Sequence, residues 1–192
     1  MFYISLNVQT TGLDPDDHQI IELAAILENT EVMLDDLPYF HAFVVDKNYL
    51  GSPDGLMLNK HNFEKIKNRK DPEDPNARFV NKYVLAEELY EWMFSLNMPE
   101  NVFTSNKSIH LAGKNIASFD FQFLKRLHGC DTLISRINHS FIDPTMLYFD
   151  FKKDSKLPST YDCWDKMGVI YKCNFKAMEV AKNTIDLLRK KY

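Results

Sequence analysis

Residues 6–15 read Leu-Asn-Val-Gln-Thr-Thr-Gly-Leu-Asp-Pro, and no other stretch of the chain is as informative. The run from Phe2 to Val8 is mainly apolar and contains β-branched residues, which predicts a buried strand. Residues 10–17 follow it as a polar turn. The chain therefore opens with a strand-to-turn unit in which positions 7 and 9 carry the amides Asn and Gln.

Length and composition indicate one well-packed domain. The 192 residues are 45% hydrophobic and 13% aromatic, which suffices for one core and leaves little chain for a second. The net charge of −4 does not suggest a surface built for electrostatic capture of nucleic acid, although a local basic patch is compatible with it. Net charge therefore does not decide between nucleic-acid and protein partners.

Cysteine content and apolar runs bear on the compartment. Cys130, Cys163 and Cys173 form no CxxC pair, and their odd number argues against a disulfide framework. The first residues show no basic region followed by a small-residue cleavage site, and the chain has no apolar run of about 18 residues. We therefore expect a cytoplasmic or otherwise intracellular protein that does not bind membranes.

Hydrophobic periodicity predicts three strands followed by alternating helices and strands. The helix over Val84–Leu96 is the best defined, because its apolar residues recur every three to four positions. The other expected strands are Gln19–Leu27, Tyr39–Val45, Ser108–Ala112 and Ser140–Ile142. The other expected helices are Leu56–Ile66, Phe119–Leu127, Leu157–Gly168 and Phe175–Lys190.

Asn68–Asn76 is charged and broken twice by proline, so residues 68–80 are expected to form a surface loop inside a single domain spanning residues 1–192. Three successive strands followed by alternating helices and strands predict an α/β fold. In such a fold a mixed central sheet carries helices on both faces.

A second motif lies at Gly113-Lys-Asn-Ile-Ala-Ser-Phe-Asp-Phe-Gln-Phe-Leu124, where Asn115 precedes a Phe-Asp pair that opens a helix. Together with residues 6–15, it resembles the motifs of the DEDD-group 3′-to-5′ exonucleases, in particular the DEDDh branch of oligoribonuclease and proofreading type. The Asp143-Pro144 turn and the last two helices also fall where such enzymes place theirs. The resemblance covers essentially the whole chain and implies a ribonuclease H-like exonuclease fold.

The resemblance also implies which positions would carry the chemistry. In this family two divalent metal ions about 3.5–4 Å apart hold the scissile phosphate, and carboxylates bind the metals. The corresponding positions in this chain are Asn7, Gln9, Asp120, Phe175 and Val180, with Phe175 at the place of a general-base histidine. Only Asp120 keeps a functional side chain.

A site of this composition is expected to lack hydrolytic activity. Magnesium prefers charged oxygen ligands, and positions 7 and 9 hold neutral amides. Phe175 cannot accept a proton from water and Val180 cannot coordinate a metal; loss of a general base alone typically slows a reaction by about 10²–10⁴-fold. We therefore expect a pseudoenzyme that needs no cofactor. If a metal ion binds at all, we expect Asp120 alone to contact it.

Other acidic residues allow a rearranged site or a structural interpretation. Tyr161 and Asp165 have the Tyr-x-x-x-Asp spacing of the tyrosine-bearing branch of the family, and with Asp120 they could serve a genuine exonuclease that uses Mg²⁺ or Mn²⁺. Against this, their helix precedes the one that should carry the motif. In the structural interpretation, Asp143 is expected to cap a turn and Asp120 to open a helix. Glu179 is then expected to be a solvated surface charge.

The positions that would hold the terminal nucleotide match the family better than the metal site does. Thr10, Thr11, Gly12 and Leu13 match a segment that contacts this nucleotide through main-chain groups and an apolar wedge. Asn115 and Phe119 match the flank of the second motif. Alternatively, the turn geometry alone requires the segment, with Gly12 supplying a positive φ. Basic clusters at residues 65–70, 152–153 and 189–191 could hold phosphates or be solvated faces.

Three accounts of the substitutions stay open. In the first, a natural pseudoenzyme binds the 3′ end of a single-stranded nucleic acid, or recruits a protein partner as an adaptor; the apolar Phe175 and Val180 favour it. In the second, Asn7 and Gln9 are inactivating substitutions in a genuine exonuclease. In the third, the chain is an interaction domain of viral or cellular origin, for which a basic cleft would indicate nucleic acid and an exposed apolar patch a protein.

Overall fold

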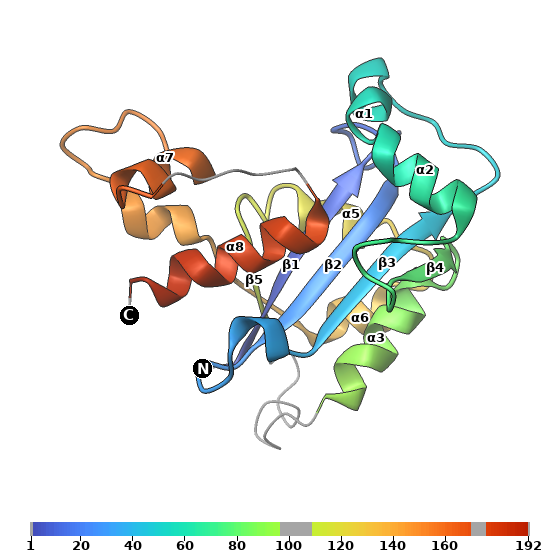
Figure 1. Ribbon diagram of the computed structural model, residues 1–192, viewed down its shortest axis with the longest axis horizontal. Coiled ribbons are helices and arrows are strands. Elements are labelled where there is room, and N and C mark those ends of the chain that lie inside the picture. Colours follow the sequence, from blue (N-terminus) through green and yellow to red (C-terminus); the bar gives the residue numbers. More distant parts are fainter. Residues whose placement is uncertain (1, 97–108, 170–175, 192) are drawn as a thin grey trace.

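A mixed six-stranded sheet forms the centre of the molecule, in the order β4-β3-β2-β1-β5-β6 (Figure 1). The computed structural model describes residues 2–96, 109–169 and 176–191. The strands are β1 (Tyr3–Thr10), β2 (Ile20–Glu28), β3 (Tyr39–Val45), β4 (Arg78–Asn81), β5 (Ile109–Ala112) and β6 (Ile137–Ile142). The pairs β1–β2 and β2–β3 are antiparallel, whereas β3–β4, β1–β5 and β5–β6 are parallel.

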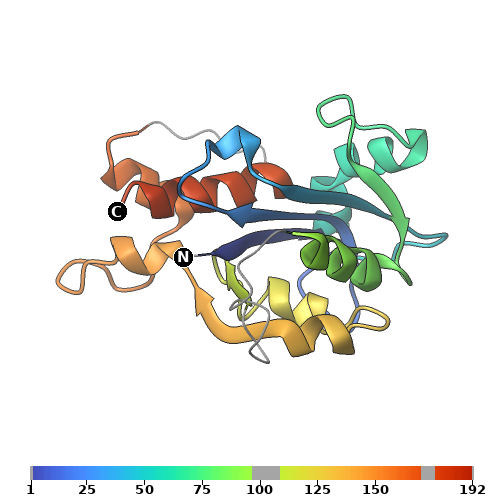
Figure 2. The same cartoon turned by 90° about the horizontal axis from the view of Figure 1, so that it is seen from below.

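Helices cover both faces of this sheet (Figure 2). One face carries α3 (Leu85–Ser95), α5 (Asp120–Leu124) and α6 (Asp131–Arg136), and the other carries α2 (Lys60–Asn68) and α8 (Ala177–Arg189). The remaining helical elements are α1 (Pro53–Leu58), α7 (Thr160–Lys166) and the 3-10 turns η1 (Leu34–Asp36) and η2 (Pro144–Tyr148). The predicted α/β class with a mixed sheet is thus confirmed. Within the described ranges, each helix is too short or too polar to cross a lipid bilayer.

The main core lies between the sheet and α3, α5 and α6. The β1 residues that point into it are Ile4, Leu6 and Val8. Burying an aliphatic side chain of this size contributes about 1.5–3 kcal/mol, so this face determines the orientation of the strand. Because side chains alternate along a strand, Ser5, Asn7 and Gln9 face the α8 side of the sheet.

Helix α8 is fixed over this second face by small residues and two polar contacts. Ala177 and Ala181 are fully buried, which lets the helix approach the sheet closely. The Ser5 hydroxyl donates a hydrogen bond to the Ala181 carbonyl at 2.8 Å. At the other end, Arg189 Nε and Nη2 donate to the buried Glu28 carboxylate at 2.8 and 3.0 Å. The N-terminal half of α8 is therefore held over β1.

Several expectations about secondary structure differ from the structure. Residues 78–80 lie in β4 and not in the loop predicted over 68–80, because a strand of four residues is too short to give a periodic signal. The helix predicted over Phe119–Leu127 ends at Leu124, since Arg126 and Leu127 donate to carbonyls three residues back at 3.1 and 3.2 Å. Helix α6 was not predicted from the sequence, because it buries only Leu133 and so has no apolar periodicity.

Candidate functional site

The candidate site lies at the carboxyl end of β1, where the chain enters the turn over residues 10–13. The Thr10 hydroxyl donates to the Gly12 carbonyl at 2.6 Å. The Thr11 N–H donates to the Gln19 carbonyl and the Thr11 hydroxyl accepts the Gln19 N–H, both at 2.9 Å. Threonine side chains therefore hold this turn and tie it to the segment just before β2.

Helix α1 packs directly on the turn. The main chain of Gly55 lies so close to the Thr11 carbonyl that a Cβ at position 55 would be 2.2 Å from its oxygen. The Ser52 N–H donates to the same carbonyl at 2.9 Å. The Asn59 side chain donates to the carbonyl of Thr10 at 3.0 Å. Asn59 also separates α1 from α2, so the single helix predicted over Leu56–Ile66 is two short helices.

Gly12 is needed for space, and not for its backbone conformation. In the described residues the glycines with positive φ are Gly129 and Gly168, so the positive φ expected at Gly12 is wrong. A Cβ at position 12 would instead lie 2.3 Å from the His18 ring. The Asp14 N–H donates to His18 Nδ1 at 3.1 Å, which holds this ring against the turn.

Asn7, Gln9 and Asp120 form one hydrogen-bonded chain on the α8 side of β1. Gln9 Nε2 donates to Asn7 Oδ1 at 3.0 Å, and Asn7 Nδ2 donates to Asp120 Oδ1 at 3.2 Å. The same carboxylate oxygen accepts the N–H of Val8 at 2.8 Å. The structure thus brings together three of the five positions that the resemblance implies. It also shows that Asn7 Oδ1 and Asp120 Oδ1 already accept hydrogen bonds from the protein.

Asp120 connects α5 to β1 in addition to opening the helix. Its side chain is fully buried. This burial raises the pKa of the Asp120 carboxyl to about 7, although hydrogen bonds from the main-chain N–H groups of Val8 and of Asp120 itself oppose the rise. Burial therefore disfavours the ionised form of this carboxyl near neutral pH.

These side chains do not fit a pair of divalent cations. Asn7, Gln9 and Asp120 supply a single carboxyl, and burial disfavours its ionised form. A magnesium site needs charged oxygen ligands in near-octahedral geometry. Across residues 2–96, 109–169 and 176–191, no group of three or more His, Cys, Asp or Glu side chains could hold a metal ion. The donor set therefore disagrees with two-metal hydrolysis.

The last helix carries position 180 over the same face of β1. Val180 is half-buried on α8 and precedes Ala181, whose carbonyl is bonded to Ser5. Ser5 and Asn7 are two positions apart on one strand face, which brings the N-terminal half of α8 over the amide chain. Phe175 lies outside the described residues.

The acidic residues weighed as alternatives occupy different parts of the structure. Asp143 Oδ1 accepts the N–H and the hydroxyl of Thr145 at 2.9 and 2.7 Å, which confirms the turn cap. Tyr161 and Asp165 lie on α7, whose buried Cys163 and Trp164 pack against Tyr148 and Leu187. Leu187 is seven residues after Val180, about 10 Å further along α8. The Asp120 side chain is bonded to Val8 and Asn7, so the structure does not pair it with α7.

The expected nucleotide-binding residues differ in exposure. Leu13 is 82% exposed, whereas Thr10 and Thr11 are buried within the turn. Asn115 is exposed and has a positive φ of 56°. Phe119 is half-buried and packs against the main core, which favours a structural role for this ring.

A buried charged network beside the site was not foreseen. Glu22 stands directly opposite Gln9 in the sheet and is 1% exposed. Its carboxylate lies 3.0 Å from His41 Nε2, and His41 Nδ1 lies 2.7 Å from Asp74 Oδ2. Burial alone would lower the pKa of His41, but the hydrogen bonds to Asp74 and Glu22 outweigh it and raise the pKa to about 9. The one signal in the sequence is a glutamate inside an otherwise apolar strand pattern.

This network opens into a cavity of about 270 Å³ between α2 and α8. Glu179 lines the cavity together with Lys176 and Lys182 and is half-buried. It is therefore not the fully solvated charge that the sequence predicts. Lys176 also donates to both oxygens of Glu73 at 2.6 Å, which joins the segment after α2 to the start of α8.

No protein-family model and no curated protein sequence matches this chain. Solved structures do. Escherichia coli exonuclease I in complex with a dT13 oligonucleotide is 14% identical with a TM-score of 0.59, over 98% of this chain and 40% of that one. Its complex with a dA16 oligonucleotide is 16% identical with a TM-score of 0.62, over 98% and 40%. The zinc-bound form of its complex with single-stranded DNA is 15% identical with a TM-score of 0.58, over 98% and 39%.

The present chain spans about 40% of the length of these exonuclease chains. At this level of identity the comparison concerns the fold alone. The fold of the chain is thus the ribonuclease H-like exonuclease fold, as the motifs at residues 6–15 and 113–124 imply.

Proposed function

We propose that this chain binds the 3′ end of a single-stranded nucleic acid at the turn over residues 10–13 and does not hydrolyse it. The observation that carries the proposal is the hydrogen-bonded chain from Gln9 through Asn7 to Asp120. At the positions where the family binds its metals, the side chains of Asn7 and Asp120 form hydrogen bonds with other groups of the protein. The chain is then a pseudoenzyme that acts by binding.

Exposed apolar side chains beside the turn support a binding role. Leu13 is 82% exposed, and Met57 and Leu58 of the adjoining α1 are 77% and 56% exposed. Because Gly55 of α1 packs against the Thr11 carbonyl, Met57 and Leu58 belong to the helix next to the turn that carries Leu13. Apolar side chains at such a place can pack against a terminal base, since every base has an apolar face.

The polar content of the site argues against hydrolysis in this proposal. Asn7 and Gln9 add no charge, Asp120 is only partly ionised near neutral pH, and Val180 offers no ligand. Phe175 cannot act as a general base, and this loss alone costs about 10²–10⁴-fold in rate. We therefore propose binding that requires neither Mg²⁺ nor Mn²⁺. Cys130 and Cys163 are free thiols, which supports an intracellular setting.

A protein partner is the second candidate, because the exposed apolar residues Leu13, Met57 and Leu58 would also suit a protein surface. In that case the chain is an adaptor that uses the same region. A binding test with nucleic acid separates the two candidates.

The test measures fluorescence anisotropy of a labelled oligonucleotide of about 5 nucleotides, within the range that one small binding module covers. We expect binding to a strand with a free 3′ end, unchanged by EDTA and weakened by a phosphate on the 3′ oxygen. Leu13→Ala should weaken binding several-fold, because it removes apolar surface that contributes about 25 cal/mol per Å² when it is buried against a base.

Met33→Ala is the matched control, because Met33 is 74% exposed but precedes η1, away from the turn. Equal affinity of wild type and Leu13→Ala, or indifference to the 3′ phosphate, would rule out end binding at this turn. No binding to any strand would favour the protein partner.

A further inference from the structure

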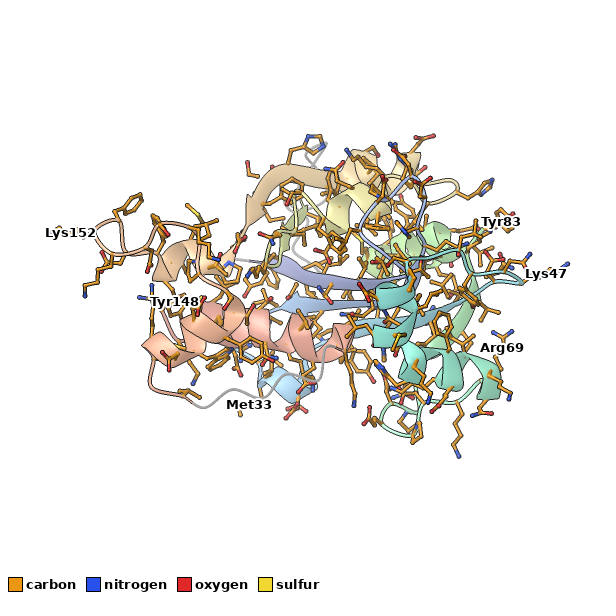
Figure 3. All side chains as sticks on the ribbon, turned by 90° about the horizontal axis from the view of Figure 1, so that it is seen from above. Met33, Lys47, Arg69, Tyr83, Tyr148 and Lys152 are labelled. Atoms are coloured by element: carbon orange, nitrogen blue, oxygen red, sulfur yellow. The ribbon has the colours of Figure 1, made fainter. Side chains whose placement is uncertain are left out.

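A projecting loop at one end of the molecule is not used by the proposed 3′-end site. It comprises residues 149–157 between η2 and α7, and is called the Phe–Lys loop below. Figure 3 shows Lys152 at its tip, at the opposite end of the molecule from Lys47 and Arg69. The turn over residues 10–13 adjoins α1, so the two regions are separate.

The loop exposes aromatic side chains in a fixed arrangement. Phe151 is 87% exposed. Its ring centroid lies 4.8 Å from that of Phe149, with the ring planes at 82°. Met146 and Leu147 of the preceding η2 are 54% and 41% exposed. Because the two rings contact each other edge to face, the loop presents an ordered aromatic face to solvent.

Lysines without salt bridges surround these rings. Lys153 pairs with Asp150 at 3.7 Å, and Lys166 pairs with Asp154. Four further lysines at this end, Lys152 and Lys156 of the loop and Lys190 and Lys191 after α8, form no salt bridge with the residues that the structure describes. These four ammonium groups are therefore available to contact phosphates.

A cavity of about 330 Å³ lies beside the loop, between η2 and the end of α8. Tyr148 and Phe149 line one side, and Lys190 and Lys191 line the other. Lys191 Nζ lies 4.8 Å from the centre of the Tyr148 ring. The surface is therefore a groove with aromatic and cationic walls.

We infer that the Phe–Lys loop and the C-terminal end of α8 form a second contact surface for single-stranded nucleic acid, which holds the strand away from its 3′ end. Exposed aromatic faces stack on bases, and lysines that form no salt bridge replace the counterions of phosphates. The cavity lined by Phe149 and Lys190 offers an aromatic ring and an ammonium group to the same flexible strand. This inference rests on the proposed function in that both surfaces bind single-stranded nucleic acid. Unlike the turn over residues 10–13, this surface does not require the end of a strand.

The experiment compares a single-stranded deoxythymidine oligonucleotide of about 30 nucleotides with a circular single strand, both longer than the roughly 4–16 nucleotides of one small module. We expect both to bind. Phe151→Ala should weaken binding about tenfold, the cost of one stacked base. Lys152→Ala with Lys156→Ala should reduce the dependence of log affinity on log salt by about 0.7 for each phosphate that the protein no longer neutralises.

The matched control is Lys47→Ala with Lys67→Ala, which removes the same charge from the other end of the molecule. An equal loss in both double variants would overturn the inference, because it would reflect net charge alone. So would an unchanged affinity in Phe151→Ala. Sedimentation with phosphatidylserine vesicles that depends on Phe151, without strand binding, would assign the surface to membranes and overturn it as well.

The two proposals fail in different ways. Binding of the circular strand without binding of the short 3′-ended strand supports the second surface and contradicts the end site. Binding of the short strand without binding of the circle supports the end site and overturns the second surface.

Discussion

Asp120 shows how burial changes the chemistry of a single carboxyl. It is fully buried and accepts hydrogen bonds from Asn7 and from the main chain of Val8. A carboxyl that binds metals must be charged, whereas burial here raises the pKa to about 7. At this position the side chain acts mainly as a connection between α5 and β1.

The protonation of Asp120 predicts how stability depends on pH. The pKa of an unfolded aspartate is about 3.9, so between about pH 4 and pH 7 the folded chain binds more protons than the unfolded chain. The free energy of unfolding should therefore fall as the pH rises through this range, by up to about 4 kcal/mol. Asp120→Asn keeps an oxygen for Val8 and Asn7, and we expect it to remove this fall.

Urea unfolding at pH 4.5 and pH 8 measures the effect. The variant should be more stable than wild type at pH 8 and similar to it at pH 4.5. Asp165→Asn is the control, because Asp165 is exposed on α7 and should leave the pH dependence unchanged. A wild-type pH dependence in Asp120→Asn would contradict the buried, partly neutral carboxyl.

At the scale of elements, α2, β2 and β3 are held together on the α8 side by Glu22, His41 and Asp74. Asn62 of α2 adds a hydrogen bond to Glu22 at 3.0 Å. The pKa of His41 is raised to about 9, so the imidazole is charged at neutral pH and bridges two carboxylates. Removing it would leave both of them without their cation in the interior.

His41 predicts a second pH dependence, of alkaline range. Because the folded chain holds the His41 proton more tightly than the unfolded chain, protonation of His41 raises the free energy of unfolding. This contribution is complete below about pH 6.5 and is lost as the pH rises through about 9. We expect His41→Gln to lower the free energy of unfolding by about 3 kcal/mol at pH 7, because it breaks a buried ionic network. The variant should also lose the wild-type decline between pH 7 and pH 10.

Thermal or urea unfolding across this pH range is the measurement, with His128→Gln as the exposed control. If the free energy of unfolding of His41→Gln still fell between pH 7 and pH 10 as in the wild type, a group other than His41 would cause the decline.

Elements with a clear periodic pattern were predictable from the sequence, and those that depend on distant partners were not. The Val84–Leu96 stripe corresponds to α3, and the Ser159 capping box begins α7 inside the predicted helix. By contrast, β4 exists because it pairs in parallel with β3, and the break at Asn59 exists because its side chain bonds to Thr10. Neither interaction is visible in the local sequence.

The site follows the same rule. The motifs identified Asn7, Gln9 and Asp120 as one group, and the structure brings them into one hydrogen-bonded chain. The direction of those hydrogen bonds, the pKa of Asp120 and the neighbouring pair of Glu22 and His41 depend on packing across several strands. Sequence spacing carries no information about such burial.

At the scale of the whole molecule, the chain has the exonuclease fold, and the carboxyl end of β1 carries the hydrogen-bonded chain of Gln9, Asn7 and Asp120. Helix α8 still lies over β1, and the turn over residues 10–13 is still braced by α1. We propose two surfaces for a strand, one at this turn beside α1 and one at the C-terminal end of α8, which lie apart in the molecule (Figure 1). On this proposal, the molecule binds single-stranded nucleic acid at two places.

The most direct test of this account is a cleavage assay with a labelled single strand of DNA or RNA in excess Mg²⁺ or Mn²⁺. It compares wild type with the double variant Asn7→Asp, Gln9→Glu. We predict that neither protein shortens the strand, because Phe175 and Val180 still leave the site without a general base and a fourth ligand. Metal-dependent loss of 3′ nucleotides by wild type, abolished by Asp120→Asn or Asp165→Asn, would contradict the account. Cleavage restored by the double variant alone would show instead that Asn7 and Gln9 inactivate a genuine exonuclease.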